Sequence, residues 1–515
     1  MKSFPVAGLL NPALRALASR RIAQWDRNLT NLQATQEAIL LAHCQKAAKT
    51  QFGRKYALGS VQSYKDYKQA LPLRPYAGFE PYLQRMRRGE RNILWPGLIS
   101  YYGQSSGTSA TAAQHKFLPI SAEQIKWQQK AAFDVMARYL LLSGDKEFAG
   151  GYNLGLFPPS ILKTEVPGVF TGSNPGIMFR EIPYVARLTT IPKLPIRDME
   201  NYDQKLEAIA KNYAQHDVRA ISGTTCWFSI FFDKLLKQHQ AKTVGEIWPN
   251  LRVLFGGGVN AEPYRDVIKA RVGRDITLMD NYNATEGGLF SVTDSFENPG
   301  LLMIPDRGVF FEFVHREDHG QENPTRLALW EVEPGVDYSI VLTTSSGLFG
   351  YYIGDFVRFI SLYPHRMEFV GRPSGVLSLT QELTTYVEIE RAVAKAQTRV
   401  PCSIVDYSVG PDIGVDGSGK GRYLFFIEFA QKPSDKARFM RVVDEELAAL
   451  NRVYREHRTH DVAILPPALA CLKAGSTHQI MEQLGFRSVQ NKFPRIVDDK
   501  KRDLISQFVE KEQVS

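Results

Sequence analysis

The chain has few cysteines, and their spacing gives no sign of a disulfide framework. Only four stand among 515 residues, far apart and without a Cys-x-x-Cys pair. Buried, reduced thiols are the expected state of such residues, which favours a cytoplasmic protein. The four are Cys44, Cys226, Cys402 and Cys471.

Long apolar runs are also missing. No run approaches the roughly 18 uninterrupted apolar residues that a spanning helix needs. The first residues, MKSFPVAGLLNPALRALASRR, contain an apolar stretch that Pro5 and Pro12 interrupt. This stretch makes a poor signal peptide and fits a first amphipathic helix better. We therefore expect a soluble protein without a membrane partner.

The charge of the chain gives no pattern typical of nucleic-acid binding. The formal net charge of +9 is modest for 515 residues. Basic residues gather locally, as in the run from Arg85 to Arg91, but no basic stripe is interleaved with stacking aromatics. Such clusters are commonly solvated faces, and their functional interpretation is a small anionic substrate. Nucleic acid is a poor candidate partner.

The hydrophobic pattern of the first two thirds predicts an α/β fold. At 515 residues the chain is too long for one core, and a prior of about 150 residues per domain suggests about three units. Short apolar runs alternate with helical patterns, which is typical of α/β architecture. The helical patterns cover 32–49, 122–142 and 203–215, and the apolar runs include 93–94, 98–102, 219–222 and 251–255.

The remaining third changes character twice. Between about 306 and 369 the pattern is β-rich, as in VFFEFV and DFVRFISL. After Arg372, two strands at 402–407 and 422–429 precede a helix that Ser434 can cap and that runs to about Arg455. We therefore predict a large N-terminal multi-layer α/β domain with a β-rich subdomain (1–378) and a small C-terminal α+β domain (379–515).

Three short motifs, in one order along the chain, suggest a nucleotide-triphosphate site. The first is YGQSSGTSATAAQHK at 102–116, a loop rich in hydroxyls and backbone N–H groups that ends on Lys116. Such groups converge on anionic oxygens and suit a polyphosphate. The second is YNATE at 282–286, whose Glu286 is a candidate Mg²⁺ ligand. The third is YYIGDFVR at 351–358, which places Asp355 on a turn that Gly354 permits.

Other motifs allow different interpretations. Gly103-Gln-Ser-Ser-Gly107 matches the nucleophile elbow of a serine hydrolase, with Ser105 as the nucleophile, but a helix must open at once after that elbow. Here a loop follows, and the next convincing helix begins at Ser121. The run 414–420 resembles a P-loop, yet a strand follows it, so we interpret it as a hairpin connection. His315 and His319 have metal-ligand spacing but no third ligand, and a solvated turn fits them better.

In the order of its motifs, the whole chain resembles the auxin-responsive acyl acid–amido synthetases. SSGTS at 105–109 is similar to the family's phosphate-binding motif, although Lys116 lies later than the family's lysine. YNATE is similar to its Tyr-x-x-Ser/Thr-Glu turn, and YYIGD to its Tyr-Arg-x-Gly-Asp motif, with Tyr352 where an Arg is expected. GFRSVQNKFPR at 485–495 is similar to its C-terminal lysine segment. This plant hormone-conjugating family also has bacterial members and belongs to the adenylate-forming superfamily of acyl-CoA synthetases and luciferases.

The resemblance implies a reaction with two small anions. ATP and Mg²⁺ would activate a carboxylic acid as an acyl-AMP, and an amino acid would then receive the acyl group. Lys492, delivered by a mobile small domain, would stabilise charge where the carboxylate meets the α-phosphate. Glu286 would hold Mg²⁺ across phosphate oxygens, and Asp355 would accept hydrogen bonds from the ribose. The guanidinium of Arg358 would offer several N–H donors near Asp355.

The remaining implied contacts fall into two groups. ATP would also contact Ser105, Ser106, Gly107, Thr108, Ser109, Tyr282, Asn283, Thr285 and Arg372. The acid would contact Gly257, Gly258, Trp227 and Phe228, although aromatics in such a run are more often core residues.

Three rival functions stay open. An acyl-CoA ligase shares the first half-reaction, but such ligases carry an Asp and a Lys-rich hinge after Gly-Arg, where this chain has GRPSGVLSLTQE. A serine hydrolase on Ser105 would need no ATP. A non-catalytic binding protein on the same fold would account for the departures at YYIGD and Lys116.

Overall fold

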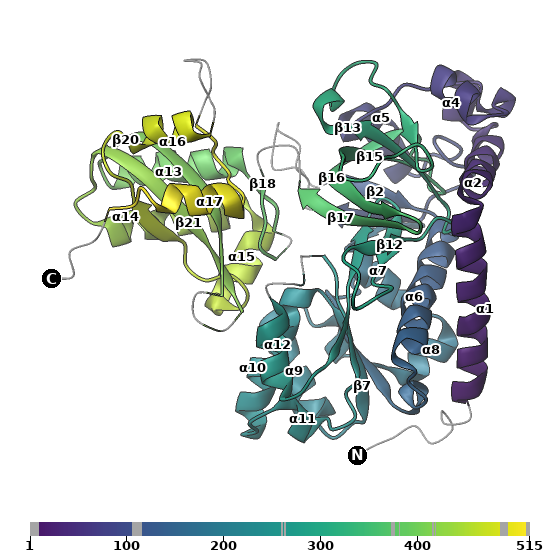
Figure 1. The fold of residues 1–515 in the computed structure, drawn as a ribbon, viewed down its shortest axis with the longest axis horizontal. Helices are drawn as coiled ribbons and strands as arrows, with labels where there is room; N and C mark the ends of the chain where they lie inside the picture. The colour runs from purple at the N-terminus through teal and green to yellow at the C-terminus, as the bar shows by residue number, and fades with distance from the viewer. Residues whose placement is uncertain are drawn as a thin grey trace.

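The chain forms a large body of stacked sheets and helices and a smaller C-terminal body (Figure 1). The structure, a computed structural model, describes residues 10–105, 116–258, 261, 264–371, 376–380, 382–414, 417, 419–484 and 493–510. The predicted α/β class with a C-terminal α+β unit is confirmed. Within these described ranges, no helix is long and apolar enough to cross a membrane.

Helices from the N-terminal region line one side of the large body. The long helices α1 (Leu10–Thr30) and α2 (Leu32–Ala47) follow one another, and α6 (Ala122–Ser143) packs beside α1 (Figure 1). Ser121 caps α6 as expected, because its Oγ accepts from the Gln124 N–H at 3.0 Å. The shorter helices are α3 (Gln51–Lys55), η2 (Leu58–Ser60), α4 (Tyr64–Ala70) and α5 (Tyr76–Arg87).

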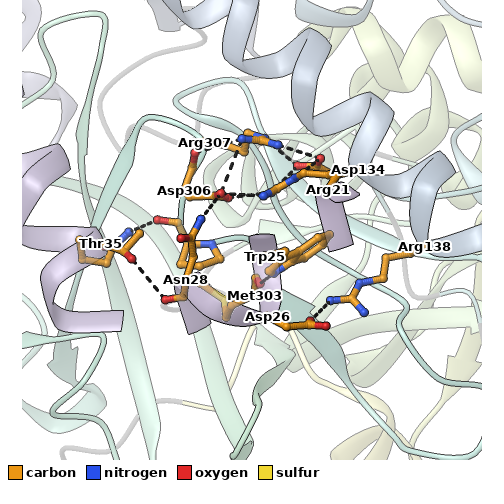
Figure 2. A network of polar contacts seen from close by, with 12 residues as sticks. Arg21, Trp25, Asp26, Asn28, Thr35, Asp134, Arg138, Met303, Asp306 and Arg307 are labelled. Carbon is orange, nitrogen blue, oxygen red and sulfur yellow. Dashed lines mark hydrogen bonds and ion pairs between the residues drawn. The ribbon is translucent and has the colours of Figure 1, made fainter. Parts of the chain in front are cut away.

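A buried ion cluster fixes α1 to α6 and to the segment before β13 (Figure 2). Arg21 and Arg307 both chelate the carboxylate of Asp134, which is fully buried, with N–O distances of 2.6 to 2.9 Å. Arg21 also binds Asp306 at 2.7 Å. Two guanidinium groups and two carboxylates balance one another, so the cluster is buried without net charge.

A parallel sheet of five strands forms the lower part of the large body. Its order is β6 (Thr190–Ile191), β3 (Tyr152–Leu156), β7 (Val218–Gly223), β8 (Val253–Phe255) and β9 (Thr277–Met279). Helices α9 (Tyr202–Tyr213), α10 (Thr225–His239), α11 (Val244–Ile247) and α12 (Arg265–Val272) lie together on one side (Figure 1). Parallel sheets of this kind bind ligands beyond the carboxyl ends of their strands.

The β-rich region predicted near 306–369 belongs to a sheet of eight strands. Its order is β10 (Asn281–Ala284), β11 (Gly288–Val292), β12 (Leu301–Met303), β17 (His365–Gly371), β16 (Tyr351–Leu362), β15 (Asp337–Thr344), β13 (Val309–His315) and β14 (Leu327–Ala328). Every pairing in it is antiparallel. The sheet shares its core with α2, α3 and α5, through residues such as Leu40, Phe52 and Phe79.

A smaller sheet of four strands carries the segment that enters the Ser/Gly loop. Its order is β2 (Lys116–Ile120), β1 (Tyr101–Ser105), β5 (Val169–Gly172) and β4 (Lys163–Val166). The strand expected at 98–102 begins only at Tyr101, and 93–94 is a bend. Helices α7 (Asn174–Arg180) and α8 (Tyr184–Thr189) follow this sheet, and the 3₁₀ turns η3 (Phe148–Gly150), η4 (Ile196–Asp198) and η6 (Arg316–Asp318) lie in the same body.

The C-terminal body is a three-stranded sheet packed against helices. β20 (Ser403–Ile413) and β21 (Gly421–Gln431) form the predicted antiparallel hairpin, and β22 (Ala468–Cys471) pairs with β21. The other elements are β18 (Val376–Leu377), β19 (Thr384–Thr385), α13 (Tyr386–Arg399), η7 (Thr459–Asp461), α16 (Ser476–Gln483) and α17 (Asp499–Ser506). A separate apolar core fills this body, including Leu377, Phe425 and Phe439.

The single helix predicted from Ser434 to Arg455 is in fact two helices, and the residue that caps the first one is not Ser434. Asp435, not Ser434, accepts from the Arg438 N–H at 2.8 Å and starts α14 (Lys436–Leu450). The chain leaves the helix at Asn451, whose side chain accepts from the Tyr454 N–H at 3.0 Å and starts α15 (Arg452–Arg458). A short polar side chain that binds nearby N–H groups favours such a break.

Candidate active site

The phenol of Tyr282 joins the second motif to the third. Tyr282 lies on β10 and donates to Asp355 Oδ2 at 2.6 Å, although the two residues are 73 positions apart. Asp355 is only 3% exposed. The turn predicted for Asp355 is wrong, because it stands inside the twelve-residue strand β16. Gly354, at a φ of +89°, provides the local irregularity instead.

Glu286 lies in the turn between β10 and β11, as predicted, and is held from two sides. It is 7% exposed, and Tyr351 donates its hydroxyl to Oε1 at 3.3 Å. Burial raises the pKa of Tyr351 well above its usual range, so the phenol stays a donor. From α6, Gln124 Nε2 donates to the carbonyls of Thr285 and Glu286 at 3.3 and 3.2 Å. Tyr351 thus orients the carboxylate, and Gln124 fixes the backbone of the turn.

The strand that leads into the Ser/Gly loop lies directly against this turn. A Cβ placed on Gly103 would lie 2.5 Å from Thr285 Cγ2, closer than carbon atoms approach. Glycine at position 103 therefore lets β1 and the β10–β11 hairpin touch. This contact brings the first motif to the second. It also explains the glycine that had suggested a nucleophile elbow.

The Gly256–Gly258 loop follows β8 and is tied to the same hairpin. Asn281 Nδ2 donates to the Gly256 carbonyl, and Asn281 Oδ1 occupies the space that a Cβ on Gly257 would need. On the other side, Gly257 N–H donates to Thr225 Oγ1 at 3.1 Å. The predicted site residue Gly257 therefore lies beside Asn281, the residue before YNATE, and Gly258 follows it in the loop at the carboxyl edge of the parallel sheet.

A partly buried carboxyl group stands at the same edge, directly before the hairpin. Asp280 follows β9, and its Oδ1 accepts from the Asn281 N–H at 2.9 Å. Burial raises the pKa of Asp280 to about 6.

Arg358 is engaged in cross-strand ion pairs on the eight-stranded sheet. It stands opposite Asp337 on β15 and opposite Glu368 on β17. Its guanidinium lies 2.7 Å from Asp337 Oδ1 and 3.7 Å from Glu368 Oε1. These carboxylates engage some of the guanidinium N–H donors that the sequence analysis assigned to the nucleotide. The nucleotide contact of Arg358 stays a prediction.

The aromatic pair assigned to the acid has structural contacts. Phe228 is fully buried in the core of the parallel sheet and packs beneath Gly256. The Trp227 ring meets Tyr202 at 4.5 Å and His457, from the C-terminal body, at 5.1 Å between centroids. Their contact with the acid stays a prediction.

Several predicted site residues lie outside the described residues. These are Ser106, Gly107, Thr108, Ser109, Arg372 and Lys492. Of Ser105 the structure describes only the backbone, which ends β1. Asn283 is exposed on β10, where its Nδ2 donates to Asn281 Oδ1 at 2.7 Å. The roles assigned to these residues stay predictions.

The rival motifs do not form the sites that they resemble. After Ser105 the chain returns as β2, antiparallel to β1, and a helix opens only at Ala122. A nucleophile elbow needs a strand followed at once by a helix, so the hydrolase interpretation loses its structural basis. The 414–420 run joins β20 to β21, as expected of a hairpin. In the part of the chain that the structure describes, no three His, Cys, Asp or Glu residues gather as a metal site.

The absence of a three-residue metal cluster among the described residues is compatible with a Mg²⁺ site. Magnesium is commonly held by one or two carboxylates, with phosphate and water oxygens as its other ligands. Glu286, buried and fixed at a loop edge, fits such a role. Sequence reasoning missed Gln124, which supports the backbone of the Glu286 turn, and Thr225, which supports the glycine loop; neither stands in a motif. It also gave Tyr351 no role, although Tyr351 stands in the YYIGD motif.

Comparison with known proteins identifies the family. Models of the GH3 family match residues 21–205 (N-terminal domain), 302–372 (central domain) and 387–501 (C-terminal domain). The chain belongs to the GH3 family. The resemblance predicted from the motifs is thereby confirmed, and the matched regions include the β1, β16 and C-terminal segments.

Individual relatives share the whole length of the chain at low identity. The indole-3-acetic acid-amido synthetase GH3.4 of Arabidopsis thaliana is 22% identical, over 95% of this chain and 94% of that protein. The solved structure of AtGH3.15 acyl acid amido synthetase, in complex with 2,4-DB, has a TM-score of 0.60 at 19% identity and covers 96% of both chains. A 2-hydroxyisobutyryl-CoA ligase, in complex with 2-HIB-AMP and CoA, has a TM-score of 0.55 at 13% identity over 93% and 92%. Amide-forming and thioester-forming enzymes thus share this fold.

Proposed function

We propose that the chain is an ATP-dependent acyl acid–amido synthetase. It adenylates a small carboxylic acid, releases pyrophosphate, and transfers the acyl group to the amine of an amino acid. The observation that carries this proposal is the meeting of three motifs around one hairpin. Gly103 touches Thr285, Tyr282 binds Asp355, and Tyr351 binds Glu286. Membership of the GH3 family supports the same reaction.

The first half-reaction brings two anions together, so the site must neutralise charge. The hydroxyls and N–H groups of Ser105, Ser106, Gly107, Thr108 and Ser109 bind the β- and γ-phosphates in this proposal. Asp355 accepts from the ribose hydroxyls, with Tyr282 holding its other oxygen in place. Arg358 and Arg372 add positive charge near the nucleotide. Gly257 and Gly258, in the loop that Asn281 ties to β10, contact the acid in this proposal.

Glu286 is the residue that we assign to Mg²⁺. Its carboxylate is buried and oriented by Tyr351, so little reorganisation is needed when a cation binds. When bound, the ion neutralises phosphate charge and supports departure of pyrophosphate. Asn283 and Thr285 flank the carboxylate on the hairpin.

Lys492 stabilises the charge that develops where the carboxylate attacks the α-phosphate. It belongs to the C-terminal domain, which we place at 379–515 after a large domain of 1–378. The apolar core of the C-terminal body, which includes Leu377, Ile389 and Phe425, supports a boundary in this region. A lysine on a separate body makes adenylation conditional on closure, which excludes water from the acyl-adenylate.

The second half-reaction uses an amine and not coenzyme A. The fold does not decide this point, because the CoA ligase has a similar one. The family models favour the amide, and the sequence GRPSGVLSLTQE lacks the hinge of the ligases. We also propose a cytoplasmic location, which the free cysteines Cys44, Cys402 and Cys471 support.

A screen of carboxylic acids tests the proposal. Each acid is supplied with MgATP, with and without a pool of the standard amino acids, and AMP and products are identified by mass. We expect AMP with at least one acid and an amide when amino acids are present. A thioester with coenzyme A and no amide would move the chain to the ligase class. No AMP with any acid would overturn the adenylation itself.

A further inference from the structure

Asn174 lies at the proposed site and belongs to none of the three motifs. It is the first residue of α7 and follows β5, whose Gly172 pairs with Gly103 on β1. A Cβ on Gly103 would lie 3.6 Å from Asn174 Cβ and 2.5 Å from Thr285 Cγ2. The two side chains therefore cover the same face of β1, where it enters the Ser/Gly loop.

The amide oxygen of Asn174 is buried and has no hydrogen-bond partner among the residues that the structure describes. Buried acceptors are nearly always satisfied, because an unsatisfied one loses its hydration without compensation. Ser173, not Asn174, caps α7, since Ser173 Oγ accepts from the Gly176 N–H at 3.2 Å. The Asn174 side chain thus has no capping role in its own helix.

A second buried polar atom without a partner borders the same hairpin. Gln128, on α6, is 7% exposed, and its Nε2 has no partner within the described part of the chain. Its Cγ lies 2.6 Å from where a Cβ on Gly288 would stand, two residues after Glu286. One acceptor and one donor therefore flank the hairpin that carries Glu286. A polar ligand at this place would satisfy such groups.

We propose that Asn174 contacts one of the two small substrates, accepting a hydrogen bond from an N–H or O–H group on it. Phosphate and carboxylate oxygens are acceptors, so neither can satisfy Oδ1. Asn174 borders Thr285. The amino group and the ribose hydroxyls of ATP are donors as well, and the MgATP affinity of the variants below decides whether they are the partner. The donor that we assign is the incoming amine, or a hydroxyl or ring N–H of the acid.

This inference rests on the proposed function and adds a residue that selects the substrate. A site that accepts a hydrogen bond from a substrate rejects analogues that lack the donor, because its own buried acceptor is left unpaired. The thiol of coenzyme A is a weak donor, so an acceptor at this place also favours an amine over a thiol. Asn174 would therefore contribute to amide specificity, if the amine is its partner, or to acid specificity.

The test compares Asn174→Leu, which keeps the size and removes the amide, with Asn174→Asp, which keeps an acceptor. Ser173→Ala is the matched control, because it weakens the start of α7 without touching Oδ1. Each variant is checked for folding by circular dichroism and for MgATP binding by calorimetry. Acid-dependent pyrophosphate exchange and amide formation are then measured separately, with benzoate against 4-hydroxybenzoate and 1-naphthaleneacetate against indole-3-acetate among the acids.

We expect Asn174→Leu to bind MgATP like wild type and to lose at least tenfold in one half-reaction, with partial recovery in Asn174→Asp. A loss in exchange confined to acids with a hydroxyl or ring N–H assigns the contact to the acid. Normal exchange with slower amide formation assigns it to the amine.

Three results would overturn the contact. They are wild-type kinetics in Asn174→Leu, weakened MgATP binding, or an equal loss in Ser173→Ala. A wild-type protein that forms AMP with no acid would instead refute the proposed function, so the two failures are distinguishable.

Discussion

Tyr282 and Asp355 are joined by a hydrogen bond of 2.6 Å between the Tyr282 hydroxyl and Asp355 Oδ2. The tyrosine comes from the first strand of the eight-stranded sheet and the aspartate from its long strand β16, so neither motif can be moved without the other. The bond fixes the direction of the Asp355 carboxylate.

Removing this hydroxyl should weaken nucleotide binding. Tyr282→Phe deletes the donor to a carboxylate, and a hydrogen bond to a charged group contributes about 1.5–3 kcal/mol. We expect Kd for MgATP to rise roughly tenfold or more by calorimetry, and Asp355→Ala to be at least as weak. Tyr363→Phe, at a position 96% exposed, is the control and should bind normally. Wild-type affinity in both site variants would refute the ribose assignment.

Glu286→Gln tests the metal assignment. Glutamine keeps the shape and an oxygen that can accept from Tyr351, but it removes the negative charge. We expect acid-dependent pyrophosphate exchange to fall on the order of a hundredfold, as for loss of one electrostatic contact, and to need more Mg²⁺. Tyr351→Phe keeps the charge and should lose much less. An unchanged Mg²⁺ dependence in Glu286→Gln would show that the carboxylate is structural.

Lys492→Ala should separate binding from chemistry. The lysine is assigned to charge that develops in the transition state, so its loss affects rate more than ground-state affinity. We expect near-normal MgATP binding and a loss in pyrophosphate exchange on the order of a hundredfold or more. Lys500→Ala, nearby in sequence on α17, serves as the control. An unchanged exchange rate would make Lys492 a surface residue.

The ion cluster of Figure 2 predicts a stability effect away from the site. Asp134→Asn removes the carboxylate that Arg21 and Arg307 share and leaves buried positive charge uncompensated. Breaking such a buried pair costs about 3–5 kcal/mol in the free energy of unfolding. Asp26→Asn is the matched control, because Asp26 is 60% exposed in its pair with Arg138. Urea unfolding measures both, and equal small losses would contradict the prediction.

The lowered pKa of His457 predicts how the free energy of unfolding depends on pH. It lies between Trp227 and Thr380, and burial lowers its pKa from 6.5 to about 4. Between these two values the unfolded chain binds a proton that the folded chain does not, so stability should fall as pH decreases from about 6.5 to about 4. Thermal unfolding across this range measures the slope. His457→Gln should reduce the slope, and an unchanged slope in that variant would remove this explanation.

The fold was predictable where local pattern and packing agree. The helices near 32–49 and 122–142 and the 402–429 hairpin stand close to their predicted places, because apolar spacing and turn residues specify them locally. The predictions failed where side chains compete for the backbone. Asn451 divides a helix that periodicity alone extends to 455, and Gly354 allows Asp355 to continue a strand where a turn was expected.

The family, the α/β class and the three motifs follow from residue types in a fixed order along the chain. Which groups meet depends on how the strands and helices pack. Tyr282 and Asp355 are far apart in sequence, and their contact arises from strand order in the eight-stranded sheet. Gly103 and Thr285 touch because glycine has no Cβ, which would lie 2.5 Å from Thr285 Cγ2. Asn174 has no motif to mark it, since a buried, unpaired oxygen is a property of packing and cannot be seen in a linear chain.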